Sequence, residues 1–136
     1  MIQGIKSKDV EKWWHHVDAY INKALERQSL GEFTSNDIKM LCQSQDMQLW
    51  VNWDNGVNAV GITQILNYPQ SNTLLMFLLG GDNMDMWKQE GWDLLNAFGK
   101  ANNCKHIQIY GRKGWGNYLK DYGVKEQGRI FYKEIA

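Results

Sequence analysis

A continuous apolar run at residues 73–79, with the sequence TLLMFLL, constrains the fold of this chain more than any other feature. The run is too short for a buried helix, and its lack of polar alternation means that both of its faces are covered. We therefore predict a central β-strand that lies between two layers of other elements. Helices are the expected covering on both sides, which gives an α/β (α+β) architecture.

Apolar residues at steps of three and four predict helices before and after this strand. The first helix is expected over about residues 7–27. A second, shorter helix begins at residues 34–37, where Thr, Ser, Asn and Asp offer an N-cap. A long helix is expected over residues 84–101 and a short one over residues 115–122, which Gly123 ends.

Alternating apolar and polar residues predict the remaining strands. Residues 47–53 and 57–66 form a hairpin around Asp54-Asn55-Gly56, which are typical hairpin-turn residues. Further strands are expected at residues 2–6, 107–110 and 129–135. The predicted order is β-α-α-β-β-β-α-β-α-β, in a single domain over residues 1–136 with a mixed, mostly antiparallel sheet.

The charge balance argues against partners that depend on a long-range electric field. Fifteen basic and fifteen acidic residues cancel, so binding to nucleic acid or to a membrane surface is not expected. Lys and Arg do outnumber acidic residues after Cys104, and a nucleic-acid role for this basic stretch is kept as a third hypothesis. No stretch is long and apolar enough to span a membrane.

Metal and hydrolase chemistry lack the patterns that they need. His15 and His16 are adjacent, so their rings point about 100° apart on a helix and cannot share a metal ion. No Cys-x-x-Cys, Gly-x-Ser-x-Gly or phosphate-binding Gly-x-x-x-x-Gly-Lys motif occurs. Cys42 and Cys104 are far apart and are expected to be reduced, small apolar residues. No metal site is predicted.

The element order and two local motifs resemble those of the GNAT N-acetyltransferases. The motifs are LWV at residues 49–51 and IYGRKGW at residues 109–115, the latter leading to LKDYGV at residues 119–124. They are similar to those of small GNAT-like proteins of tailed bacteriophages, and the architecture resembles the podovirus internal virion protein A family. The resemblance covers essentially the whole chain. It implies a phage protein, located in the cytoplasm of the infected bacterial host or in the virion.

In active members of this family, the acetyl-CoA pyrophosphate rests on backbone N–H groups at the start of the central helix. A glycine-containing loop supplies them, because glycine allows close approach and a helix N-terminus attracts anions. The matching stretch here is GGDNMDMW, residues 80–87, in which Asp82 and Asp85 add carboxylates. We expect Asp82 or Asn83 to cap the helix and no cofactor to bind. If acetyl-CoA binds, the resemblance assigns it to Met76, Leu78, Leu79, Gly80, Gly81 and Asn83.

The family's general acid is a tyrosine on the short helix that follows the next strand, where a phenol can protonate the departing thiolate. Aligned on Gly123-Val124, that position holds Leu119. Tyr118 is adjacent, but one residue along a helix turns the side chain by about 100°. Tyr122 lies too near the helix end. Tyr118 and Tyr122 are the candidates for this general acid, and neither fits the family pattern. Asp46, Asp54 or His106 could serve as a general base, but the sequence sets none of them apart.

Aromatic and basic residues offer candidate protein contacts, because Trp and Arg dominate interface hot spots. Trp50 and Tyr110 fall on the strand faces opposite their apolar neighbours, and we expect helices to cover them. The interface candidates are Trp50, Trp53, Arg112, Lys113 and Trp115.

Two main hypotheses follow from the sequence. The first is a GNAT-like phage protein without acetyltransferase activity, with a virion assembly, structural or host-interaction role. Its partner is a phage or host protein, or a second copy of the chain. The alternative is an active acetyl-CoA-dependent N-acetyltransferase.

Overall fold

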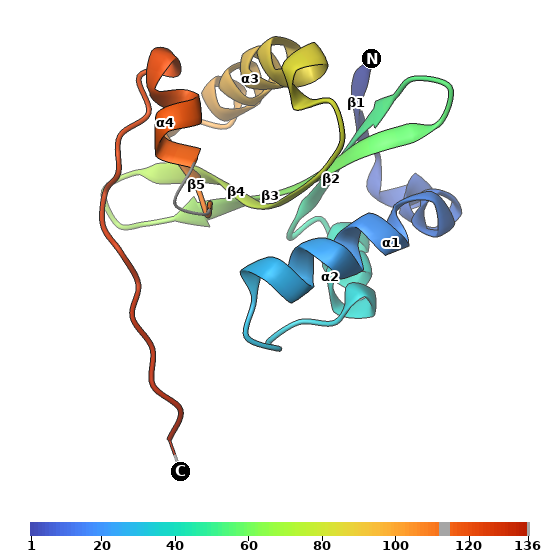
Figure 1. Ribbon diagram of the computed structural model, residues 1–136, viewed down its shortest axis with the longest axis horizontal. Coiled ribbons are helices and arrows are strands. Elements are labelled where there is room, and N and C mark those ends of the chain that lie inside the picture. The colour runs from blue at the N-terminus through green and yellow to red at the C-terminus, as the bar shows by residue number, and fades with distance from the viewer. Residues whose placement is uncertain (112–114, 136) are drawn as a thin grey trace.

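The computed structural model describes residues 1–111 and 115–135 as a five-stranded sheet with helices on both faces (Figure 1). The strands are β1 (Ile2–Ile5), β2 (Gln48–Trp53), β3 (Val57–Asn67), β4 (Asn72–Gly81) and β5 (Cys104–Ile109). The helices are α1 (Val10–Gln28), α2 (Ser35–Gln43), α3 (Met84–Ala101) and α4 (Trp115–Leu119). Short 3₁₀ turns precede α1 (Ser7–Asp9) and follow α4 (Lys120–Tyr122).

The strands lie in the order in which they occur along the chain, β1-β2-β3-β4-β5. The first four pair antiparallel, and β5 pairs parallel to β4 because α3 provides the crossover between them. Helices α1 and α2 cover one face of the sheet, and α3 and α4 lie on the other (Figure 1). The predicted α/β class and the mixed, mostly antiparallel sheet are confirmed.

The α1 face holds the larger part of the core. The apolar stripe of α1 is buried against alternate residues of the sheet, and Leu49, Val51, Ile62 and Leu78 are each at most 1% exposed. Burying each such side chain contributes about 1.5–3 kcal/mol, so this layer is the main source of stability. The buried residues of α1 are Val10, Trp14, Val17, Ile21, Ala24 and Leu25.

The α3 face holds a smaller cluster around Leu74, Met76 and Leu95. Trp50 lies here, edge-on to Phe98 with ring centroids 5.2 Å apart, and its indole N–H donates to Thr63 Oγ1 at 2.9 Å. The expectation that a helix covers Trp50 is confirmed, and its half-buried ring packs in this layer. Its role as a protein contact stays a prediction.

The local signals of the hairpin and of α2 predicted both elements well. Asn55 and Gly56 adopt positive φ, as the turn between β2 and β3 requires. Thr34 caps α2, since its hydroxyl accepts from the Asp37 N–H at 3.2 Å. The Asp37 carboxylate accepts in return from the Thr34 N–H at 2.8 Å, and this backbone hydrogen bond lowers the pKa of Asp37.

The strand expected over residues 129–135 does not form. Residues 124–135, hereafter the tail, run as an extended segment without helix or strand (Figure 1). The strand-favouring residues of this segment were not sufficient, because a strand forms only when its backbone pairs with a neighbour, and this segment pairs with no strand in the described ranges. Ile130 and Phe131 are 85% and 87% exposed as a result.

Within the described ranges, no helix combines the length and apolar character that a membrane crossing requires. Cys42 and Cys104 are both free thiols, and Cys42 is buried.

Candidate functional site

The strongest candidate site lies where β4 and β5 separate. Their parallel pairing ends at Met76 and Ile109, and the Tyr110 N–H donates to the Met76 carbonyl at 3.3 Å as the last contact. Strand β4 continues to Gly81, whereas β5 stops at Ile109. The outer backbone edge of residues 77–81 therefore has no strand beside it in the described part of the chain.

A β-bulge at Phe77 marks the beginning of this opening. Ile62 pairs with Leu78 and Thr63 pairs with Met76, so Phe77 is an extra residue on β4. A bulge bends its strand and increases the local twist, which helps β4 to diverge from β5. The Phe77 ring meets Phe33 and Tyr110 edge-on, with centroids 5.2 and 6.2 Å away, and aromatic rings thus border the opening on the α1 side.

Gln28 reaches into the opening from the end of α1. Its Nε2 donates to the carbonyl oxygen of Leu79 at 3.4 Å, which occupies part of the open β4 edge. Its Oε1 is buried and has no hydrogen-bond partner in the structure. A buried acceptor without a donor costs free energy, so this amide is a point where a ligand or a moving side chain could gain a hydrogen bond.

The turn from β4 into α3 depends on Gly81. Its φ is 147°, and a Cβ at this position would lie 2.5 Å from Ala59 Cα. Only glycine fits, because the conflict is with backbone and cannot be relieved by turning a side chain.

Helix α3 begins without a side-chain cap, so the expected self-capping by Asp82 or Asn83 is wrong. Asn83 is the N-cap residue but has φ 55° and ψ 44°, and its side chain makes no capping hydrogen bond. An N-cap normally has extended φ and ψ, which let its side chain reach the amides of the next turn. The left-handed conformation of Asn83 turns its side chain elsewhere, and the first amides of α3 have no capping side chain.

Two carboxylates nevertheless lie at this helix start. Asp82 and Asp85 are both exposed. The hydroxyl of Tyr118, on α4, donates to Asp85 Oδ1, and this hydrogen bond raises the pKa of Tyr118. The ammonium of Lys88 lies 4.2 Å from the centre of the Tyr118 ring.

The side chains of α4 divide as the helix geometry predicted. Leu119 is 4% exposed and faces the interior, whereas Tyr118 points to α3. Tyr122 also contacts α3, with its hydroxyl donating to Gln89 Oε1 at 3.2 Å and its ring near Trp92. Neither candidate tyrosine lines the cavity described next.

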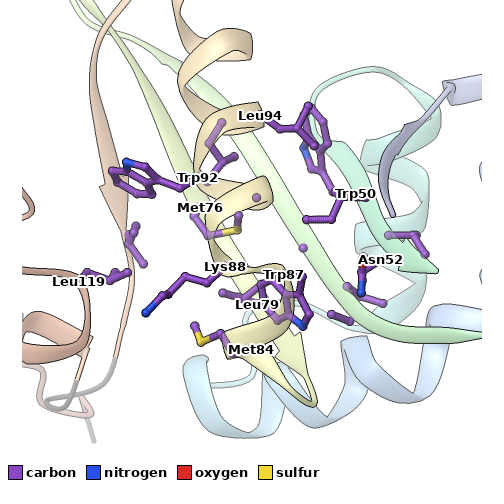
Figure 2. A pocket seen from close by; sticks show the side chains of 18 of the residues that line it. Trp50, Asn52, Met76, Leu79, Met84, Trp87, Lys88, Trp92, Leu94 and Leu119 are labelled. Atoms are coloured by element: carbon purple, nitrogen blue, oxygen red, sulfur yellow. The ribbon is translucent and has the colours of Figure 1, made fainter. Parts of the chain in front are cut away.

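An apolar cavity of about 80 Å³ lies between α3 and the sheet. Figure 2 shows side chains from β2, β4, α3 and α4 around it, among them Trp50, Met76, Leu79 and Leu119. Asn52 is its most buried polar neighbour, at 7% exposure, and Asn52 Oδ1 has no hydrogen-bond partner. The rest of the lining is almost entirely apolar, so the cavity is suited to apolar groups.

The structure brings the residues named for acetyl-CoA onto one strand and the turn that follows it. Met76 and Leu79 face the cavity, whereas Leu78 is buried against α1 on the other face. Gly80 and Gly81 end β4, and Asn83 is the N-cap residue of α3. Their role in binding acetyl-CoA stays a prediction.

The interface candidates separate into different environments. Trp53 is 42% exposed and packs edge-on against Trp13, with ring centroids 5.7 Å apart. Trp115 is half-buried and lines the cavity. Tyr110 is 44% exposed, so the expectation that a helix covers it is wrong. Arg112 and Lys113 lie outside the described residues.

Sequence reasoning missed Gln28, Phe33 and the contact between Asp85 and Tyr118. Gln28 did carry a signal, since it is a polar residue one turn beyond Leu25 on the buried stripe of α1. The other contacts join segments far apart in the chain and left no local pattern. Within the described ranges, no group of three or more His, Cys, Asp or Glu residues could hold a metal ion.

Solved structures of acetyltransferases share this arrangement over the whole chain. An aminoglycoside acetyltransferase from an uncultured soil metagenomic sample, in complex with sisomicin, superposes with a TM-score of 0.67 and 15% identity, covering 100% of this chain and 96% of the other. A ribosomal-protein-alanine N-acetyltransferase from Brucella melitensis biovar Abortus 2308 gives 0.68 and 10%, with 99% of each chain covered. A predicted acetyltransferase with acetyl-CoA from Clostridium acetobutylicum gives 0.70 and 11%, with 98% and 95% covered.

The chain has the GNAT fold. At these identities the likeness establishes the fold and not the activity. No protein-family model matches the sequence, and a search of curated proteins found no match. In this GNAT-fold chain, the opening between β4 and β5 and the start of α3 are therefore a candidate site defined by its own geometry.

Proposed function

We propose that this chain is a GNAT-fold protein of a tailed phage that does not transfer acetyl groups and acts through protein contacts. Its role is in virion assembly or structure, or in contact with a host protein. The observation that carries the non-catalytic part is the placement of the α4 side chains. Leu119 faces the interior, whereas the hydroxyl of Tyr118 donates to Asp85.

A general acid must place its proton within hydrogen-bond reach of the leaving group. The Tyr118 hydroxyl already donates its proton to a carboxylate on α3. The two α4 side chains that line the cavity, Trp115 and Leu119, carry an indole and an alkyl group, and neither is an acid. Acetyl transfer would thus lack a proton donor on α4 at the point where the thiolate leaves.

Electrostatics at the start of α3 support the same proposal. Uncapped helix amides attract an anion, but Asp82 and Asp85 oppose a diphosphate there. Two unit charges about 4 Å apart repel by about 1 kcal/mol in water, which is comparable with the attraction of a helix end. Lys88, in the second turn of α3, packs on the rings of Tyr118 and Tyr122.

The test is an acetyl-transfer assay on the purified chain. The protein is incubated with acetyl-CoA and with amine acceptors of several classes, namely polyamines, peptide N-termini and aminoglycosides, and released CoA thiol is measured. We expect no release above the rate without protein. Any turnover above that rate would overturn the non-catalytic proposal, and a fall of this turnover in a Tyr118→Phe variant would identify Tyr118 as the general acid. For the assembly role, mass spectrometry of purified virions should detect the chain, and its absence would restrict the proposal to a host contact.

The second candidate is an active acetyl-CoA-dependent N-acetyltransferase. Two observations favour it, namely the uncapped start of α3 and the unpaired outer edge of β4. Thermal unfolding with acetyl-CoA or CoA separates the two candidates. A ligand at 100 times its dissociation constant adds about 2.7 kcal/mol of stability, which raises the melting temperature by several degrees. No shift at millimolar cofactor would exclude this candidate.

A further inference from the structure

The tail carries an unusual number of exposed apolar side chains. Between residues 129 and 135, Ile130, Phe131, Tyr132 and Ile135 are 70–97% exposed. Single exposed apolar residues are common, but a contiguous group of this size marks a contact surface. The segment has the sequence RIFYKEI, which is rich in residues that favour strands.

The apolar residues of the tail would occupy both faces of a strand. In an extended chain, Ile130 and Tyr132 point to one side, and Phe131 and Ile135 point to the other. A strand that is exposed on one face alternates apolar and polar residues. A segment with apolar residues on both faces is instead suited to a sheet that is covered on both sides, as this sheet is (Figure 1).

The sheet provides a free edge for such a strand. Strand β5 is at the end of the strand order and pairs only with β4 in the described part of the chain. The tail passes this edge, because Gln108 Nε2 on β5 donates to Gln127 Oε1 at 2.8 Å. An unpaired edge next to an unpaired apolar segment is a template for strand addition.

After Gln127 the tail leaves its own domain. It extends away from the sheet in Figure 1, and an ion pair joins Arg129 to Glu126, three residues earlier in the tail itself. Its apolar residues are not buried by the chain to which they belong. A second copy offers an identical β5 edge, and two copies can exchange tails reciprocally in a closed twofold arrangement, which leaves neither edge exposed.

We propose that residues 128–135 pair with β5 of a second copy of this chain, in a symmetric dimer with two exchanged strands. This goes beyond the proposed function and does not depend on it, since strand exchange needs neither acetyl-CoA nor a phage partner.

The test measures mass and tail protection together on the full chain. Light scattering after size-exclusion chromatography should give twice the chain mass of 15.8 kDa at high concentration and dissociation on dilution. Amide hydrogen exchange at residues 129–135 should be slow in the dimer and fast in the diluted monomer. A chain that stays monomeric at every concentration overturns the proposal, whether its tail amides are exchanging or protected. A dimer whose tail amides exchange freely overturns it as well.

A matched pair of variants tests which contact carries the dimer. Phe131→Asp and Lys133→Asp add the same carboxylate on the same face of the tail, but only the first removes a large apolar side chain. Phe131→Asp should weaken dimerisation on the order of 10²- to 10⁴-fold, because the symmetric dimer loses two buried aromatic side chains. Lys133→Asp should have a much smaller effect. Equal effects of the two variants, or none, would contradict the exchange of tails. Both residues lie outside the core, so circular dichroism should report an unchanged fold.

Discussion

The two glycines at the end of β4 should lose very different amounts of stability when each is replaced by alanine. Gly81 has φ 147°, and an added Cβ would lie 2.5 Å from Ala59 Cα and 2.6 Å from the Asn58 carbonyl oxygen. Gly80 has an ordinary φ, and its Cβ would meet the Tyr20 carbonyl oxygen at 3.6 Å, a normal van der Waals distance. Alanine at Gly80 therefore serves as the control for alanine at Gly81.

The magnitude for Gly81→Ala has two parts. A non-glycine residue in a disfavoured backbone conformation costs about 1–3 kcal/mol. Overpacking against fixed atoms costs about 1–3 kcal/mol more. The sum, about 2–6 kcal/mol, is below the total stability of about 7–20 kcal/mol expected for a chain of this length, so the variant should still fold. Gly80→Ala should change stability by less than about 1 kcal/mol.

Urea unfolding followed by circular dichroism measures both differences, with calorimetry as a check. At about 4 °C per kcal/mol for a chain of this size, Gly81→Ala should melt on the order of 10–20 °C below the wild type. The reasoning is refuted if Gly81→Ala melts within about 2 °C of the wild type, or if Gly80→Ala loses as much stability as Gly81→Ala. Either result would mean that β4 enters α3 by a different turn from the one described.

Three further predictions concern the cap, the buried thiol and the helix start. Thr34→Ala removes the oxygen that caps α2 and should cost about 1 kcal/mol in urea unfolding, whereas Thr34→Ser should restore most of it. Burial raises the pKa of the Cys42 thiol to about 12, so it should resist a thiol reagent in the native protein and react after unfolding. The unfolded thiol ionises near its ordinary pKa of 9.0, while the folded thiol stays protonated. The free energy of unfolding should therefore fall as pH rises from about 9 to about 12. A flat profile in a pH series of urea titrations would contradict this. Asp85→Asn removes a carboxylate at the start of α3 and should tighten any CoA binding by about 1 kcal/mol, roughly fivefold in dissociation constant. Titration calorimetry measures this affinity. An unchanged or weaker affinity would argue against repulsion at that position.

The parts of the fold that the sequence predicted are those set by local signals. Alternation defined β2 and β3, and the Asp54-Asn55-Gly56 turn fixed their hairpin. The buried stripe of α1 and the polar group at Thr34 gave the helices on the first face. In each case, neighbouring residues in the chain carry the information.

The candidate site was less predictable, because its features depend on contacts between distant segments. The bulge at Phe77 lies in a run that is apolar throughout, so an inserted residue leaves no break in the pattern. Asn83 is a common N-cap residue, but its left-handed conformation prevents capping. The tail shows the converse case, in which a strand-like pattern has no strand beside it in the described chain.

Because of the extra residue, β4 can lose one residue at the bulge while its other side chains keep their faces of the sheet. Ile62 and Thr63 on β3 face Leu78 and Met76, so removing Phe77 leaves every other β4 residue on its present side of the sheet. Removing a residue outside the bulge, such as Leu75, would instead move its neighbours to the opposite side. A chain without Phe77 should therefore fold, but with a straighter β4 that stays beside β5 for longer. Slower amide exchange at residues 78–81 would show that the gap between the two strands had closed. Unchanged exchange would show that the bulge does not cause the opening.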